Sequence, residues 1–343
     1  MKNEDLMDKG IYKPEEIPVV TFVMPAYNVE KYIGDAITSI QNQTVPHWKL
    51  IIVNDGSSDN TLQTATDFQL KDNRIKVISM GSPSGSAYQP RKKGILEADT
   101  EWVAPLDADD YIEADYLKKL LDKQKETDSD AVYPTMICEK DGEVITPKDN
   151  SLFTDFKVGR DCVAYTLDGW KINCNGGIIR KQLYEETFDT FDSSLTYSCA
   201  DELLTRQLLF MAPKVSFSEA KYFYRDNPTS ITRKKSLKLF DFLINNITLT
   251  EFAETNFEKG SPTNIFAQKQ NFHGVFDALR LLNKFEFSPE EEKNVLSLID
   301  RSARKVDLAF LKPYVSQKYM WLFKGGLNFS RNFLKFSDKF TKS

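Results

Sequence analysis

The sequence predicts an α/β protein whose mostly parallel sheet is flanked by helices, with a helical extension at the C-terminal end. Three observations lead to this class. Short apolar runs alternate with helical patterns from residue 19 to 136, the apolar runs end at turn signals, and the chain becomes helical after about residue 228. Alternating strands and helices are typical of a parallel sheet covered on both faces.

The predicted strands are apolar, β-rich runs: Val19–Met24, Trp48–Val53, Ile75–Ser79, Trp102–Leu106 and Ala131–Met136. The helices expected between them are Val29–Gln41, a segment from Ser58 or Asp59 to Phe68, Gly94–Ala98 and Ala114–Lys125. In the first helix Ile33, Ile37 and Ile40 fall on one face. Pro90 predicts a late start for the helix around Gly94, because proline breaks a helix interior.

Four regions are predicted: a lead over 1–18, an α/β domain over 19–228, a helical region over 229–311 and a tail over 312–343. In the second region the pattern after Cys138 is less regular, and residues 140–143 suggest a hairpin. Helices are expected within 237–258, 264–282 and 289–310.

The composition narrows the class of protein. With 343 residues, 41% of them apolar, the chain can bury a core, and no apolar run has the length needed to span a bilayer. The polar start, Met1–Glu16, does not resemble a secretory signal, so we expect a cytoplasmic protein. Only two histidines are present, which argues against zinc. The cysteines form no Cys-x-x-Cys pair and are expected to be reduced thiols: Cys138, Cys162, Cys174 and Cys199.

An apolar run ends abruptly in three carboxylates, Asp107, Asp109 and Asp110. Two near-adjacent carboxylates are the usual protein share of a Mg²⁺ or Mn²⁺ site, and substrate phosphates supply further ligands. The alternative is a surface turn or a helix N-cap, since aspartate suits both.

Three predicted strand ends offer polar groups to one edge of the sheet, where ligands of open α/β sheets bind. They are Pro25-Ala26-Tyr27-Asn28, Asn54–Asp59 and Asp107-Ala108-Asp109. This arrangement suits a nucleotide, with Tyr27 stacked on the base or packed beneath it. Asp55 either accepts a hydrogen bond from the base or ribose, or is simply a turn residue. The absence of a Gly-x-Gly-x-x-Gly or phosphate-loop pattern disfavours a dinucleotide or ATP site.

Four segments in this order resemble the family-2 glycosyltransferases: residues 23–33 (VMPAYNVEKYI), 41–44 (QNQT), 52–61 (IVNDGSSDNT) and 106–111 (LDADDY). The resemblance extends over residues 19–125. It implies a GT-A (Rossmann-like) fold, a nucleotide-sugar donor and transfer with inversion at the anomeric carbon. Residues 19–125 would then form the nucleotide-binding half and 126–228 the acceptor half.

The resemblance also implies roles for single residues. Asp55 matches the base-binding aspartate of the family. Asp107 and Asp109 match its Asp-x-Asp motif, with Asp109 as the direct ligand of Mn²⁺ or Mg²⁺. Arg91 matches the arginine of Ala-Arg-Asn-x-Gly, although this chain has PRKKG at 90–94. With Asp55, Arg91 and Asp107, the expected nucleotide-sugar contacts are Pro25, Ala26, Tyr27 and Ala108.

The predicted catalytic base is Asp201. In family members this position follows a glutamate, which Ala200 replaces here, and Tyr222-Phe-Tyr-Arg and Ser230-Ile-Thr downstream support the alignment. An acceptor hydroxyl needs a base, which contributes roughly 10²- to 10⁴-fold. The alternative for Asp201 is an N-cap. Trp170 is either an acceptor contact or a core residue.

The tail combines basic and aromatic residues. From Lys312 onward there are seven basic residues and one acidic residue. Four phenylalanines follow 4-3-4 spacing at positions 329, 333, 336 and 340, and this predicts an amphipathic helix. Such a helix could lie on an anionic membrane, pack on its own chain or form a homodimer.

The sequence therefore predicts a glycosyltransferase that adds a sugar from a nucleotide-sugar, by family habit a UDP-sugar, to a surface or capsular glycan. The acceptor is expected to be lipid-linked at the inner membrane face, and no nucleic-acid partner is expected. Two alternatives remain open. One is a sugar-nucleotide nucleotidyltransferase, which normally needs a basic Gly-rich loop that Val23–Asn28 lacks. The other is an inactive nucleotide-sugar-binding homologue.

Overall fold

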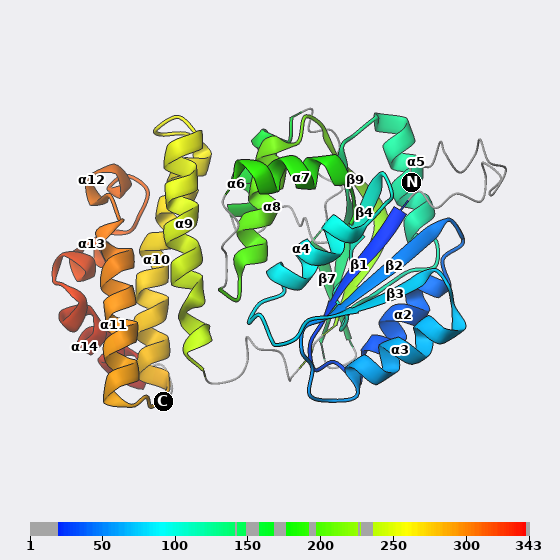
Figure 1. The fold of residues 1–343 in the computed structure, drawn as a ribbon. Helices are drawn as coiled ribbons and strands as arrows, with labels where there is room; N and C mark the ends of the chain where they lie inside the picture. Colours follow the sequence, from blue (N-terminus) through cyan, green and yellow to red (C-terminus); the bar gives the residue numbers. More distant parts are fainter. Residues whose placement is uncertain are drawn as a thin grey trace. The chain divides into compact units, whose positions relative to one another are not determined.

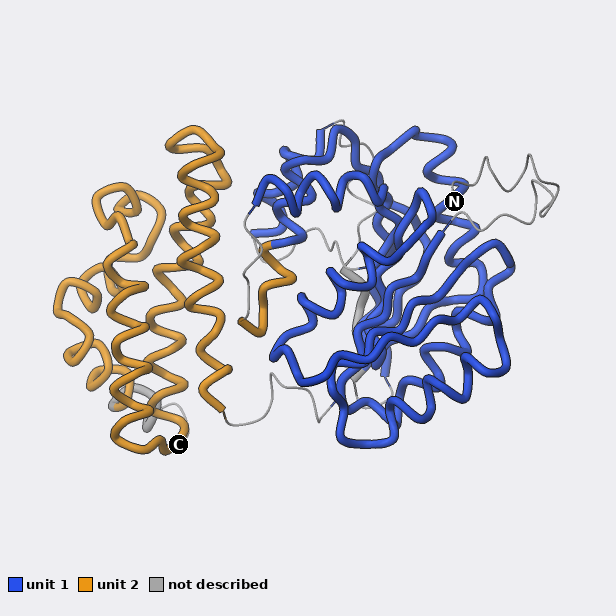
Figure 2. The backbone as a smooth tube through the Cα atoms, in the orientation of Figure 1, with its two compact units in different colours: residues 1–196, 204–227 blue, residues 197–203, 228–343 orange. Residues whose placement is uncertain are grey.

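The protein divides into two compact units in the computed structural model, which describes residues 20–140, 143–148, 158–167, 176–191, 197–225, 227 and 236–340. The sheet unit is Met1–Thr196 with Leu204–Asn227, and the helical unit is Tyr197–Leu203 with Pro228–Ser343 (Figure 2). The predicted lead over 1–18 and Trp170 lie outside the described residues.

The sheet unit contains a nine-stranded sheet in the order β3-β2-β1-β4-β8-β6-β9-β5, with β7 paired to β6 (Figure 1). The strands are β1 Val20–Ala26, β2 Trp48–Asn54, β3 Ile75–Ser79, β4 Trp102–Pro105, β5 Tyr111–Ile112, β6 Ala131–Lys140, β7 Glu143–Lys148, β8 Ile178–Arg180 and β9 Val215–Tyr224. The first four in spatial order, β3, β2, β1 and β4, are parallel as predicted.

Beyond β4 the sheet is mixed. β8 is antiparallel to β4 and β6, and β9 is parallel to β6 but antiparallel to β5. The parallel pairing thus covers the part of the chain with regular strand–helix alternation, and the less regular part after Cys138 forms the mixed strands. The predicted hairpin is present, because β6 and β7 pair antiparallel up to Lys140 and Glu143.

The helices of this unit are α2 Ile33–Gln41, α3 Thr61–Lys71, α4 Tyr88–Glu97, α5 Tyr116–Thr127, α6 Gly159–Leu167, α7 Lys181–Thr190 and α8 Ala200–Met211, which passes into the helical unit at its first turn. They cover both faces of the sheet. Phe22 and Met24 pack in one core with Ile33 and Ile37 of α2. Val23 points the other way, as strand side chains alternate, and Gly94 of α4 lies against it: a Cβ on Gly94 would be 2.5 Å from Val23 Cγ1.

α4 begins at Tyr88, two residues before Pro90, so the late start predicted from Pro90 is wrong. The first backbone N–H groups of a helix have no partner within it, so proline in the first turn removes no helical hydrogen bond. The N–H of Arg91 donates to the carbonyl of Ala87 at 3.1 Å and begins the ladder.

The helical unit has its own core. Its elements are η4 Leu237–Phe240, α9 Asp241–Asn256, α10 Pro262–Lys284, α11 Pro289–Arg304, α12 Leu308–Leu311, α13 Gln317–Lys324 and α14 Leu327–Phe340. α11 begins with a capping box between Ser288 and Glu291, which satisfies two free N–H groups. No helix within the described ranges combines the length and the hydropathy that crossing a bilayer requires.

The predicted tail helix is present as α14, separated from α13 by Gly325 and Gly326. It packs within its own unit: Leu334 is 4% exposed, and the buried Ser330 donates to the carbonyl of Leu322 at 2.7 Å. The inward face of α14 therefore includes Ser330 and Leu334 and is not formed by the phenylalanines alone. Phe329 remains 39% exposed, and the side chains of Phe336 and Phe340 lie outside the described residues.

Candidate functional site

Three strand ends meet at one edge of the sheet, as the sequence predicts. β1 pairs with β2 on one side and β4 on the other, with Ala26 opposite Asn54. Beyond the strand ends, the N–H of Asp55 donates to the carbonyl of Ala26 at 2.9 Å, and the N–H of Leu106 donates to Val23 at 3.0 Å. The predicted nucleotide residues after β1, β2 and β4 therefore lie in neighbouring turns.

The turns after β1 and β2 are joined by Asn28. Its φ of 51° is left-handed, a conformation that asparagine tolerates better than most residues. Its N–H donates to Ser57 Oγ at 3.1 Å, and its Oδ1 accepts from the N–H of Ser58 at 2.8 Å. This rigid connection leaves the neighbouring Tyr27 39% exposed at the sheet edge, where its ring is available to a ligand.

Asp55 is buried and already bound to one neighbour. Its Oδ1 accepts from the N–H of Ser84 at 2.9 Å, and its Oδ2 accepts from the Ser84 hydroxyl at 2.8 Å. A carboxylate has about four acceptor positions, so each oxygen keeps capacity for one more donor. Gly56 allows this close approach: a Cβ there would lie 2.8 Å from the backbone nitrogen of Pro83.

Arg91 and Asp107 form an ion pair. The Arg91 Nη2 atom lies 2.7 Å from Asp107 Oδ1, and the Arg91 side chain is 9% exposed against 37% for Asp107. The buried Arg91 guanidinium therefore offsets the charge of the partly exposed Asp107 carboxylate at this edge of the sheet. The structure thus brings together two residues that the resemblance links to the donor.

Asp109 is partly buried, as Asp107 is. Its Oδ2 accepts from the side-chain amide of Asn227 at 3.0 Å. Burial raises the pKa of the Asp109 carboxyl above its usual value, and the charge of Asp107 adds to the rise. A bound cation would relieve this crowding of negative charge.

The third acid, Asp110, is buried and holds the loop in place. Its Oδ2 accepts from the Tyr222 hydroxyl at 2.7 Å, and its Oδ1 accepts from the N–H of Arg225 at 2.9 Å. Burial, and then the charges of Asp109 and Asp107, raise the pKa of Asp110 well above its usual value. Asp110 therefore connects the acidic loop to the end of β9. Because both of its carboxylate oxygens accept hydrogen bonds within the protein, we do not assign it as a metal ligand.

The acidic loop fits a hard divalent cation with few protein ligands. Among the residues that the structure describes, no three His, Cys, Asp or Glu side chains form a complete metal cage. Mg²⁺ and Mn²⁺ suit carboxylate oxygen, and Mg²⁺ is commonly held by one or two carboxylates plus substrate phosphates. Asp109, with Asp107 beside it, matches that donor set. The backbone of Ala108 lies between them.

Asp201 lies in the helical unit, as the second residue of α8, and therefore in the first turn of the helix and not at its N-cap. Its Oδ1 accepts from the N–H of Glu202 at 3.1 Å. Its role as the base remains a prediction.

Sequence reasoning missed three residues that organise this site: Ser84, Asn227 and Tyr222. No sequence pattern around Ser84 indicates that it binds Asp55. Tyr222 and Asn227 lie in or next to the Tyr-Phe-Tyr-Arg stretch that supports the resemblance, but only the pairing of β9 with β5 places them beside the acidic loop.

Comparison with known proteins agrees with this geometry. The model of "Glycosyl transferase family 2" matches residues 21–194. Glycosyltransferase GlyG of Streptococcus pneumoniae is 27% identical over 230 residues, 63% of this chain and 73% of GlyG. The putative teichuronic acid biosynthesis glycosyltransferase TuaG of Bacillus subtilis is 38% identical over 105 residues, 31% of this chain and 41% of TuaG.

Among solved structures, the crystal structure of S. aureus TarS 1-349 in complex with UDP-GlcNAc is similar, with a TM-score of 0.72 and 21% identity. The similarity covers 93% of this chain and 91% of that one. The GT-A fold that the motifs predict is thereby confirmed, with its C-terminal helices. With the matched family model, the strand-end motifs and this fold, the chain belongs to glycosyl transferase family 2.

Proposed function

We propose that the protein transfers a sugar from a UDP-sugar to a hydroxyl group of a glycan acceptor, with inversion at the anomeric carbon. The observation that carries the proposal is the meeting of Asp55, the Arg91–Asp107 pair and Asp109 at one edge of the sheet. A buried hydrogen-bond acceptor suits the base of a nucleotide. A buried guanidinium suits a diphosphate, and clustered carboxylates suit a metal ion. TarS, with which the chain shares a fold, binds UDP-GlcNAc.

Each residue has a distinct task in this proposal. Asp55 accepts a hydrogen bond from the uracil base of the donor, and Tyr27, Pro25 and Ala26 contact the nucleotide beside Asp55. Arg91 orients Asp107 and offsets its negative charge near the diphosphate. Asp109 and Asp107 would hold Mn²⁺ or Mg²⁺, which when bound stabilises the leaving diphosphate as a Lewis acid.

The proton of the acceptor hydroxyl goes to Asp201 in this proposal. The hydroxyl oxygen attacks the anomeric carbon as the bond to the diphosphate breaks, so no covalent enzyme intermediate is needed. The support for Asp201 is the sequence motif and its position in the first turn of a helix, where a carboxylate is favoured by the helix dipole.

We propose further that the acceptor is a lipid-linked glycan and that the helical unit associates with an anionic membrane. Trp321 is 57% exposed and lies edge-on to Phe329, with ring centroids 4.8 Å apart. Lys318 lies over the ring of Phe333.

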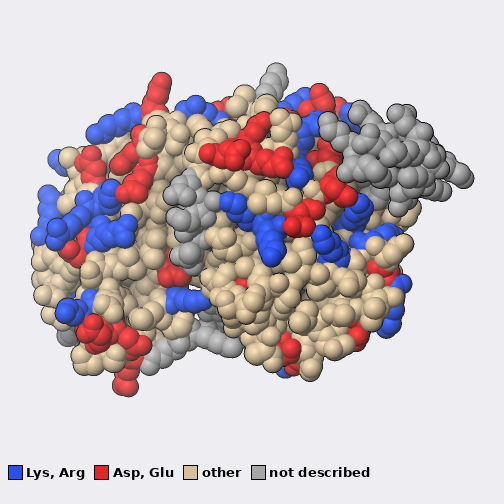
Figure 3. All heavy atoms as spheres, in the orientation of Figure 1, with Lys and Arg blue, Asp and Glu red and all other residues tan. Residues whose placement is uncertain are grey.

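On the face shown in Figure 3, Lys and Arg side chains gather over the helical unit, with acidic clusters between them. Exposed Trp and Phe beside basic residues are typical of interfacial helices. TuaG, by its name a putative glycosyltransferase of teichuronic acid biosynthesis, supports a glycan acceptor.

The test is a thermal-shift panel of UDP-, GDP- and dTDP-sugars with Mn²⁺, followed by an assay of sugar release. A true donor at 100 times its dissociation constant stabilises the protein by about 2.7 kcal/mol. We expect UDP-sugars to stabilise and to be slowly hydrolysed. Consumption of a sugar phosphate with a nucleoside triphosphate would instead indicate a nucleotidyltransferase, and binding without any sugar release would indicate an inactive homologue.

A further inference from the structure

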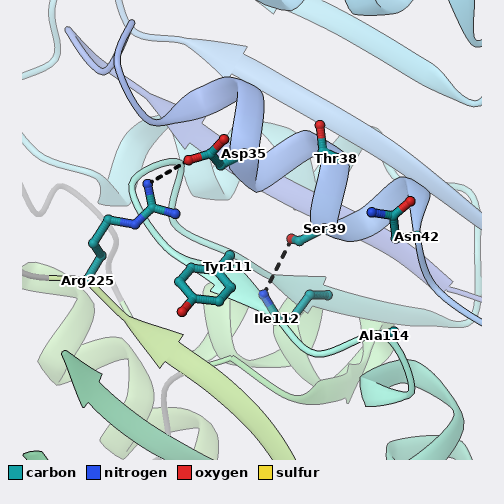
Figure 4. Close-up of a pocket in the computed structure, with 8 residues that line it drawn as sticks. All are labelled: Asp35, Thr38, Ser39, Asn42, Tyr111, Ile112, Ala114 and Arg225. Carbon is teal, nitrogen blue, oxygen red and sulfur yellow. Dashed lines mark hydrogen bonds and ion pairs between the residues drawn. The ribbon is translucent and has the colours of Figure 1, made fainter. Parts of the chain in front are cut away.

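A pocket lies in the sheet unit, between α2 and β5 (Figure 4). Its volume is about 380 Å³, within the range of small-molecule sites. α2 contributes Asp35, Thr38 and Ser39, and Asn42 follows at its end. The opposite wall comes from Tyr111 and Ile112 of β5, Ala114, and Arg225 after β9.

The walls of this pocket are fixed by contacts outside it. At the end of α2, the Gln43 amide donates to the carbonyl of Glu113 at 2.7 Å, and the N–H of Thr44 donates to Ala114 at 2.9 Å. The Tyr111 ring stacks on Phe223 with centroids 4.6 Å apart, and its hydroxyl donates to Glu139. The pocket is therefore preformed, which lowers the entropy cost of binding.

The chemistry of the lining suits a neutral, hydroxyl-rich ligand. Arg225 Nη1 lies 3.1 Å from Asp35 Oδ2, so the charges at this end balance. The pair offers donors and acceptors together, and Thr38 and Asn42 add a hydroxyl and an amide. Phe223 and Arg225 cover the faces of the Tyr111 ring, so the apolar wall consists of the ring edge with Ile112 and Ala114, against which the C–H groups of a sugar can pack.

The position of the pocket links it to the acidic loop. The N–H of Arg225 donates to Asp110, and Asp110 directly follows Asp109. The pocket thus begins beside the loop where transfer is proposed. A polymeric acceptor must extend away from the hydroxyl that receives the sugar.

We propose that this pocket, lined by Asp35, Thr38, Asn42, Tyr111 and Arg225, is a carbohydrate subsite for one sugar unit of the acceptor glycan. The role as acceptor subsite rests on the proposed function, whereas the ligand class rests on the pocket itself. A sugar bound there would hold the growing chain beside the acidic loop.

The test is a titration of the protein with the methyl glycosides of glucose, galactose, N-acetylglucosamine and glucuronic acid. Binding is monitored by the NMR chemical shifts of the backbone amides. We expect at least one of the three neutral glycosides to move the amides of residues 35–42, 111–114 and 225, and glucuronic acid is the charged comparison. No shift at these amides with any neutral glycoside would overturn the proposal. Shifts at these amides with inorganic phosphate but with no neutral glycoside would make the pocket an anion site and would also overturn it.

Matched variants locate the binding. The double variant Thr38→Val/Asn42→Leu removes a hydroxyl and an amide without changing charge, and we expect it to weaken glycoside binding about tenfold, which is about 1.4 kcal/mol. The control is Thr66→Val/Gln63→Leu on α3, because Thr66 makes the same hydroxyl-to-carbonyl bond four residues back as Thr38. Equal binding by both double variants would contradict the assignment.

A parallel titration with UDP and Mn²⁺ separates this proposal from the proposed function. If UDP binds and no glycoside does, only the subsite is overturned. If glycosides move the pocket amides but UDP does not bind, the proposed function fails while the ligand class of the pocket is supported.

Discussion

The hydroxyl of Tyr222 donates to Asp110 Oδ2 at 2.7 Å and accepts from the backbone N–H of Asp107 at 3.2 Å. One side chain of β9 thus holds both ends of the acidic loop, with Asp109 between them. Burial and the charge of Asp110 raise the pKa of Tyr222 well above its usual value, so the hydroxyl keeps its proton and remains a donor.

Tyr222→Phe is therefore expected to lower activity by raising the concentration of Mn²⁺ needed for half-maximal rate. A buried acceptor left without its donor also costs about 1–3 kcal/mol of stability. The measurement is a Mn²⁺ titration of sugar release together with a urea unfolding curve.

The matched control is Tyr116→Phe, which removes another buried hydroxyl, one that accepts from the N–H of Gly177 at 2.7 Å. Both variants should lose stability, but only Tyr222→Phe should change the Mn²⁺ requirement. The same Mn²⁺ curve for both variants would show that Tyr222 has no special effect on the metal loop.

Asp109→Ala is expected to abolish metal-dependent donor hydrolysis and transfer while the fold remains intact. The reason is the loss of the carboxylate that is proposed to bind the ion directly. Hydrolysis is measured with Mn²⁺, with Mg²⁺ and with excess chelator. Asp122→Ala, at an exposed helix position paired with Lys118, is the control that should retain activity. Full wild-type activity in excess chelator would show that activity does not require a metal ion bound by Asp109.

Asp201→Asn is expected to reduce turnover by roughly 10²-fold or more and to leave donor affinity nearly unchanged, since the base acts on the acceptor. Turnover, donor affinity and melting temperature are measured together. Glu202→Gln is the neighbouring control, because Glu202 accepts from the Asn245 amide at 3.2 Å and its change should affect stability more than turnover. A large fall in melting temperature with Asp201→Asn would indicate a structural role for this residue.

Membrane association is best tested with Trp321→Ser/Phe329→Ser. Both rings are exposed, so their loss should leave folding intact and reduce co-sedimentation with anionic vesicles. Binding of the wild type should also fall as salt rises, because added ions screen the attraction to basic residues. Leu70→Ser, at a position 78% exposed in the sheet unit, is the control.

Truncation at Pro313 is a poorer test, since it would uncover the core of the helical unit, which includes Leu322 and Leu334. Unchanged vesicle binding by Trp321→Ser/Phe329→Ser would mean that these aromatic residues do not contact lipid.

The strand–helix order and the strand-end motifs were readable from the sequence because they depend on local patterns. β1, β2 and β4 end where turn residues follow apolar runs, and parallel strands bring their carboxyl ends to one edge. The position of Asp55, Asp107 and Asp109 in neighbouring turns follows from this. The start of α4 was misjudged because the cost of Pro90 depends on its position in the helix.

Only the tertiary structure decided which partners these residues have. Ser84 on Asp55, Asn227 on Asp109 and Tyr222 on Asp110 are separated from them by 29, 118 and 112 positions. Such contacts depend on how β9 pairs with β5 and how the segment before α4 folds back, which no local pattern encodes. The same holds for the tail, where periodicity predicted an amphipathic helix. Packing of α14 against α10 and α13 determined that Leu334 and Ser330 are buried, whereas Trp321 and Phe329 are exposed.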